Sequence, residues 1–173
     1  MKRMMGLLLA LAVVAAASFA VLAQARPAGT ASPASGSRSA DVTFTKWVTS
    51  LPADPSKTLA GSTMVGVVGG DVGQGRFAAM LFSDDTTSRK GFWLGRPLYG
   101  FFGSEHSFVA NNFITENDTV KPITATIRGV VIMGWMKGAR VTGEYTQRDK
   151  CPIRTPGNVL GKTCWEGTLH LQL

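Results

Sequence analysis

The segment TCWEGTLHLQL (residues 163–173) alternates apolar and polar side chains. Successive side chains of a β-strand point to opposite faces, so this alternation predicts a strand with one apolar and one polar face. The apolar face carries Trp165, Leu169, Leu171 and Leu173, and the polar face carries Glu166, Thr168, His170 and Gln172.

Working outward from this segment, similar runs separated mostly by glycine or aspartate turns predict further strands. Short strands with glycine-marked turns are typical of barrels and sandwiches. We predict an all-β domain that forms an eight-stranded antiparallel up-and-down barrel, because closure leaves no exposed edge strand. Such a barrel has room for packed side chains or for one small ligand. The expected strands are 42–48, 62–68, 74–82, 92–101, 106–114, 120–133, 139–148 and 163–173.

Three features of these strands leave alternatives open. The run FAAML (77–81) would also suit a short helix, and glycine and proline interrupt 92–101. In the first strand, Lys46 interrupts the apolar series of Val42, Phe44 and Val48.

The chain before the barrel is expected to serve export. Residues 1–25 contain two positive charges, an uncharged apolar run and the small-residue sequence Ala23-Gln24-Ala25, which is the pattern of a cleaved signal peptide. A membrane anchor is the competing interpretation of the apolar run. Residues 26–40 lack large apolar side chains and are expected to be a disordered linker. We therefore predict a barrel domain at 41–173 that is secreted or lies on the exterior of the cell envelope, with no membrane contact after signal cleavage.

The charge of the domain excludes one class of partner. Four of the 18 Lys and Arg residues precede residue 41, which leaves 14 against 11 Asp and Glu. Nucleic-acid binding needs a clustered basic face, so no nucleic-acid partner is expected.

Cys151 and Cys164 are the only cysteines, and an even count in an exported chain predicts a structural disulfide. A redox pair lacks CxxC spacing, and two cysteines alone cannot form a structural zinc site.

The sequence contains few signs of catalytic chemistry. There is no HExxH, no GxSxG and no phosphate-binding loop, so we expect no metal and no cofactor. Glu144 and Glu166 lie on the polar phase of their strands and are expected to face water, although a carboxylate facing the lumen could act as a base.

The candidate ligand-binding residues are Asn112, Trp135, Met136 and Tyr145. If the fifth strand is regular, one residue of the pair Asn111-Asn112 faces inward, either as a satisfied core group or as part of a pocket. Trp135 and Met136 lie between Gly134 and Gly138, where they either line the mouth of the barrel or fold back as a plug. Tyr145 belongs to the apolar phase of its strand, where core packing is the alternative to ligand contact.

Several motifs resemble a known family. The run GVVIMGWMKG (129–138), the sequence VTGEY (141–145) and CWEGTL (164–169), together with EHSF (105–108), resemble small exported bacterial proteins with an allene oxide cyclase-like barrel domain. The resemblance covers roughly 42–173 and implies an eight-stranded antiparallel barrel. Plant cyclases of this superfamily close a fatty-acid epoxide ring by confinement in an apolar cavity, and the related dirigent proteins steer radical coupling. The bacterial relatives have no assigned activity. The catalytic residues of the plant proteins have no matched positions here, so no catalytic residue is predicted.

Three functions are compatible with these observations. The leading interpretation is an exported, non-catalytic barrel module whose partner would be a small apolar ligand. The alternative is a cofactor-free cyclase or isomerase that confines an apolar substrate in the barrel. A third is a structural module whose lumen is filled. An open cavity with converging polar groups would favour the first two.

Overall fold

The computed structural model describes residues 38–89 and 91–173. The expected signal peptide and most of the expected linker lie outside these residues. The first strand begins at Ser39, three residues earlier than predicted, and Ala40 is buried. Two residues assigned to the linker by sequence therefore belong to the barrel wall. No helix in the described part of the chain is long and apolar enough to cross a membrane.

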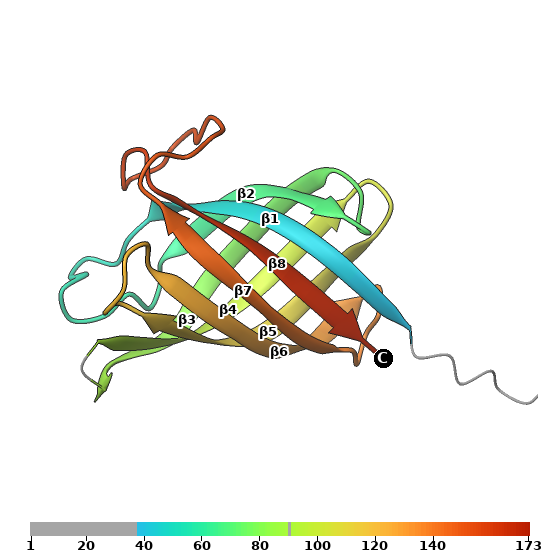
Figure 1. Cartoon of the computed structure of the whole chain (residues 1–173), viewed down its shortest axis with the longest axis horizontal. Helices are drawn as coiled ribbons and strands as arrows, with labels where there is room; N and C mark the ends of the chain where they lie inside the picture. The colour runs from blue at the N-terminus through green and yellow to red at the C-terminus, as the bar shows by residue number, and fades with distance from the viewer. Residues whose placement is uncertain (1–37, 90) are drawn as a thin grey trace, which may run out of the picture. The chain divides into compact units, whose positions relative to one another are not determined.

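Eight antiparallel strands form a closed barrel in which each strand pairs with its neighbour in sequence, as predicted. The barrel closes where β1 pairs with β8, for example Val42 with Leu169, and Figure 1 shows these two strands side by side. No helix occurs in the residues described. The strands are β1 (Ser39–Ser50), β2 (Thr63–Gly70), β3 (Gly75–Arg89), β4 (Phe92–Gly103), β5 (Ser107–Asn117), β6 (Thr124–Gly134), β7 (Arg140–Arg148) and β8 (Cys164–Gln172).

The two ambiguous segments are both strands. The FAAML run lies in β3, which pairs with β2 on one side and β4 on the other, so neighbouring strands override its local helix preference. In β4 the pairing with β5 passes from Gly95 to Leu98, and Pro97 falls in the gap. Proline has no N–H to donate, and the interruption expected from sequence is confined to Arg96 and Pro97 in the β4–β5 ladder.

Aromatic rings fill the middle of the lumen. Phe77 contacts Phe44, Tyr99 and Phe101 at centroid distances of 5.6, 5.0 and 5.2 Å. Phe101 stacks on Phe108 at 4.6 Å, and all five side chains are buried. Such contacts stabilise the barrel and divide its interior, because no space for a ligand remains where these rings meet. A ligand inside the barrel would therefore have to bind toward one end, beyond these rings.

Candidate functional site

A cavity of about 290 Å³ occupies the lumen at the end where β1, β3, β5 and β7 terminate. Apolar side chains line most of its wall, and its charged and hydroxyl groups gather on one side. Leu51, Pro55 and Leu160 are exposed and lie among its lining residues, so they form its mouth. Figure 1 shows that the loops after β1 and β7, which carry these residues, lie at the same end of the barrel.

A second hollow, of about 400 Å³, lies on the barrel wall over β1, β2, β7 and β8. Thr43, Thr45, Glu144, Glu166 and Thr168 belong to its lining, and these side chains are on the polar phase of their strands. An open, polar surface of this kind is already solvated and gains little by binding a small molecule. The lumen cavity is the better candidate because it is more enclosed and apolar.

Lys46 lies at the inner side of the lumen cavity. It shares the inward face of β1 with Val42, Phe44 and Val48, so its interruption of the apolar series places a charged side chain inside the barrel. The residue is only 2% exposed. Its Nζ lies 2.5 Å from the hydroxyl of Tyr99 and 4.0 Å from the ring centroid of Tyr145. Two aromatic rings and a hydroxyl thus take the place of water around the amine.

Burial lowers the pKa of Lys46 to about 7, because an apolar environment disfavours the ammonium form. The carboxyl of Glu116 acts in the opposite direction and raises it. Burial also holds the pKa values of Tyr99 and Tyr145 well above their usual value, so both hydroxyls stay protonated. Near neutral pH the site therefore contains an amine that readily loses its proton, next to hydroxyls that do not.

Glu116 faces the same cavity from β5 and is half-buried. Burial raises its pKa, whereas the positive charge of Lys46 and the side chains of Trp165 and Tyr145 lower it. The indole Nε1 of Trp165 is buried with no hydrogen-bond partner among the described residues, and the Trp165 side chain helps to lower the pKa of Glu116. Glu116 and Lys46 interact through their charges, and no direct ion pair joins them in the described chain.

The loop between β1 and β2 forms one side of the mouth and is held by Asp84. The Asp84 carboxylate accepts hydrogen bonds from the Thr58 hydroxyl, the backbone N–H groups of Leu59 and Ala60, and the Trp93 indole. Burial alone would raise the pKa of Asp84, but these donors together lower it. Trp93 itself lines the cavity, and its ring occupies the space that a Cβ on Gly95 would need.

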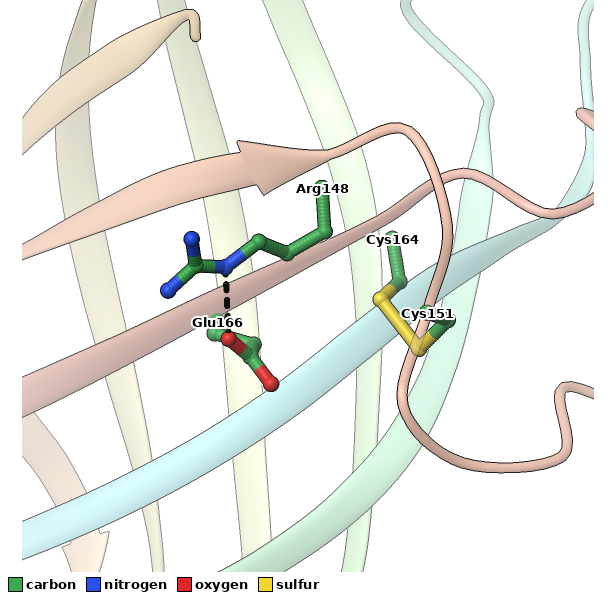
Figure 2. Close-up of polar contacts among 4 residues, drawn as sticks. All are labelled: Arg148, Cys151, Cys164 and Glu166. Carbon is green, nitrogen blue, oxygen red and sulfur yellow. Dashed lines mark hydrogen bonds and ion pairs between the residues drawn. A yellow bond between two sulfur atoms is a disulfide. The ribbon is translucent and has the colours of Figure 1, made fainter.

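The loop between β7 and β8 forms the other side of the mouth and contains the disulfide. Cys151 and Cys164 are bonded with a Cα–Cα distance of 5.4 Å, as predicted. Figure 2 shows this bond beside the ion pair of Arg148 and Glu166, whose Nε and Oε2 atoms are 2.7 Å apart. Val159 N–H donates to the Val48 carbonyl at 3.0 Å, which fixes the loop to β1 next to Leu160. The disulfide loop is therefore part of the cavity entrance.

No protein-family profile, curated protein or solved structure matches this chain. The chemistry of the cavity therefore follows from its own residues. An amine, a carboxyl and two hydroxyls at one side of an apolar space suit a ligand that is mainly apolar and carries one polar group.

The structure brings one of the four predicted ligand-binding residues into this cavity. Tyr145 is buried on the inward face of β7 and lines the site. Asn112 also faces inward and is fully buried, but it does not line this cavity. Its Nδ2 donates to the Ala110 carbonyl at 3.0 Å, and its Oδ1 has no hydrogen-bond partner in the described part of the chain. Asn112 is thus a core polar group that is only partly satisfied.

Trp135 and Met136 lie at the opposite end of the barrel, in the turn between β6 and β7. The Trp135 ring stacks on His106 at a centroid distance of 4.1 Å and also approaches Phe108 at 6.4 Å. Met136 is buried and has φ of 55°, a conformation that few non-glycine residues adopt. Both side chains fold back onto the core and do not belong to the lining of the lumen cavity.

Sequence reasoning missed Lys46, Tyr99, Glu116 and Trp165 as members of one site. For Lys46, the available signal in the sequence was that a lysine interrupts an apolar series. Glu116 is on the same face of β5 as Ala110, Asn112 and Ile114, but the predicted strand ended at residue 114. Glu144, by contrast, is exposed as expected, and Glu166 pairs with Arg148 on the outer wall.

Proposed function

We propose that this protein is an exported, non-catalytic barrel that binds a small, mainly apolar molecule in the lumen cavity. The observation that supports it is the combination of an apolar wall with Lys46, Glu116 and Tyr145 at one side. Apolar pockets with a few converging polar groups are the usual form of small-molecule sites. The volume of about 290 Å³ suits a short alkyl chain or a small aromatic compound.

The experiment is a fluorescence titration with N-phenyl-1-naphthylamine, a small neutral dye whose emission rises in apolar surroundings. We expect saturable binding to the oxidised protein and displacement by 1-octanol. The substitution Met64→Trp places a large ring on the cavity wall and should weaken binding at least about tenfold, which corresponds to about 1.4 kcal/mol.

A matched control is Met80→Trp. Met80 lies on the adjacent strand β3 and is 45% exposed on the outer face, so the same substitution there adds a ring outside the lumen. This variant should bind the dye like the parent protein. Equal weakening by both variants, or dye binding that 1-octanol does not displace, would contradict a lumen site.

The compartment is part of the proposal. The disulfide is consistent with an oxidising environment outside the cytoplasm. Residues 1–25 have the pattern of an export signal, so the mature chain is expected to begin at Arg26. N-terminal sequencing of material recovered from the cell exterior tests this, and a chain that still begins at Met1 would refute it.

The alternative function is a cofactor-free cyclase or isomerase that acts by confining its substrate. Glu116 favours it, because a half-buried carboxyl with a raised pKa could donate a proton to a bound substrate. Glu116→Gln separates the two functions. If the protein is a binding module, this variant should bind the dye with unchanged affinity. If it is an isomerase, the variant should still bind an apolar epoxide substrate but should no longer convert it.

A further inference from the structure

Lys46 brings a primary amine to the inner side of an apolar cavity. The residue is 2% exposed, and it belongs to the lining of the cavity. A molecule in the cavity would therefore meet the amine directly. The other lysines with described side chains, Lys57, Lys121, Lys137, Lys150 and Lys162, are all exposed on the protein surface.

Structural stability does not require an amine at this position. Lys46 has no ion-pair partner among the described residues, and the hydrogen bond to Tyr99 is its single polar contact there. A buried lysine that lacks a salt bridge costs folding free energy, because the charged form loses its hydration. Buried, desolvated lysines with this environment are typical amine nucleophiles.

We propose that Lys46 binds an apolar aldehyde or ketone as a reversible imine. This inference rests on the proposed function, since it names the chemical class of the ligand that the same cavity takes. The apolar wall would hold the alkyl or aryl part of the ligand, and its carbonyl group would lie toward Lys46, Tyr99 and Glu116.

The covalent step balances with water as the other product. The nitrogen lone pair of Lys46 attacks the carbonyl carbon, a C–N bond forms, and a proton passes to the oxygen to give a carbinolamine. The C–O bond then breaks, the oxygen leaves as water after accepting a proton, and loss of the remaining N–H proton gives the neutral imine. No oxidant or reductant is needed, and the reverse sequence releases the carbonyl compound by hydrolysis.

The surrounding groups fit the needs of this step. Burial lowers the pKa of Lys46 to about 7, so part of the amine is unprotonated and nucleophilic at neutral pH. Glu116, whose pKa burial raises, can supply the proton for the departing water. A protonated imine would retain the position of the ammonium over the Tyr145 ring, where Nζ lies 4.0 Å from the centroid.

The test is reductive trapping with a defined probe. The oxidised full-length mature protein is incubated with octanal at pH 7, reduced with sodium cyanoborohydride, and analysed by intact mass and peptide mapping. We expect one octyl group per chain on Lys46, at least about tenfold more than on any exposed lysine, because only Lys46 lies in the apolar cavity that would hold the alkyl chain. Excess 1-octanol, which has the same chain and no carbonyl, should protect Lys46.

Two variants check the assignment. Lys46→Arg retains a cation but cannot form an imine, and Lys46→Met removes the nitrogen. Both should lose the trapped adduct, and circular dichroism with dye binding shows whether either still folds. Lys57→Arg is the control, because it makes the same change at an exposed lysine. It should leave trapping at Lys46 unchanged.

The outcomes separate the two proposals. If octanol displaces the dye but octyl groups spread over the exposed lysines, the imine proposal is wrong and apolar binding stands. If the dye does not bind and octanol gives Lys46 no protection, both proposals fail. An adduct on Lys46 that octanol suppresses supports both.

Discussion

The Lys46 Nζ and the Tyr99 hydroxyl lie 2.5 Å apart inside the barrel and join β1 to β4 across the lumen. Tyr99 belongs to the aromatic cluster that fills the middle of the barrel, and Lys46 lines the cavity. This contact therefore marks the boundary between the packed and the open parts of the interior. Each group gives the other a hydrogen-bond partner, which offsets part of the cost of burying both.

The burial of Lys46 should make stability depend on pH. Its pKa is about 7 in the folded protein, against an ordinary lysine value of 10.5, so between these values the unfolded chain binds more protons. The free energy of unfolding should then rise with pH over this window. Lys46→Met removes the effect, so the variant should be more stable than the parent at pH 7. We expect this advantage to shrink by about 2–3 kcal/mol by pH 9.5, measured by urea unfolding.

Other groups that face Lys46 limit the measurement. Glu116 is coupled to it, and the raised pKa values of Tyr99 and Tyr145 reduce stability above pH 10, where the unfolded tyrosines ionise. The comparison is therefore kept between pH 7 and 9.5. Lys57→Met is the control, because it makes the same substitution at an exposed lysine. A constant difference between Lys46→Met and the parent would contradict the lowered pKa.

Asp84→Asn should loosen the loop at the cavity mouth. Asparagine replaces one carboxylate oxygen with an amide nitrogen that cannot accept, so it loses either the hydrogen bonds from Thr58 and Ala60 or those from Leu59 and Trp93. We expect a loss of about 1–2 kcal/mol in unfolding free energy at pH 7. Because the folded pKa of Asp84 lies below its unfolded value, its contribution is present above pH 4 and is lost as pH falls through the folded pKa.

The variant should thus differ from the parent at pH 7 and converge with it in acid. Urea unfolding at pH 7 and pH 3 measures both. Asp54→Asn provides the comparison, because Asp54 is an exposed residue of the same loop and its carboxylate contacts its near neighbours Ser56 and Lys57. An Asp84→Asn variant as stable as Asp54→Asn at pH 7 would refute the role of Asp84.

Cys151→Ser should reduce both stability and ligand affinity. The disulfide closes a loop with a sequence separation of 13, and removing it gives the unfolded chain more freedom, which costs about 3 kcal/mol. The same loop carries Leu160 to the mouth, so dye binding should weaken as the loop loosens. Thermal unfolding and dye titration test this, and the reduced parent protein should behave like the variant. An unchanged unfolding midpoint would argue against the bond in the mature protein.

Trp135→Ala should act on stability alone. The ring stacks on His106 and approaches Phe108, at the end of the barrel away from the cavity. Truncation should cost about 3 kcal/mol in unfolding free energy, because it leaves a void over the core. Dye affinity should remain as in the parent. Weakened binding with little change in stability would instead restore Trp135 as part of a ligand entrance.

Local patterns were enough to predict the barrel. Alternation in 163–173 and in the other runs assigns an inward and an outward face to each strand, and the closed order of eight antiparallel strands follows because edges are costly to expose. The Cys151–Cys164 bond was predictable for a similar reason, since only one pairing of two cysteines exists within the chain. The inward position of Tyr145 and the outward positions of Glu144 and Glu166 also follow from strand phase.

The site itself required the tertiary structure. Lys46, Tyr99, Glu116 and Trp165 come from β1, β4, β5 and β8, and strand phase shows that a side chain faces inward but not how far along the lumen it lies. That depth depends on the register of each strand pair and on which rings fill the middle. Asn112 and Trp135 show the consequence, because both side chains pack inside but neither lines the cavity. Sequence determined the faces of the strands, and only the closure of the barrel decided which inward side chains meet, because such contacts join residues far apart in the chain.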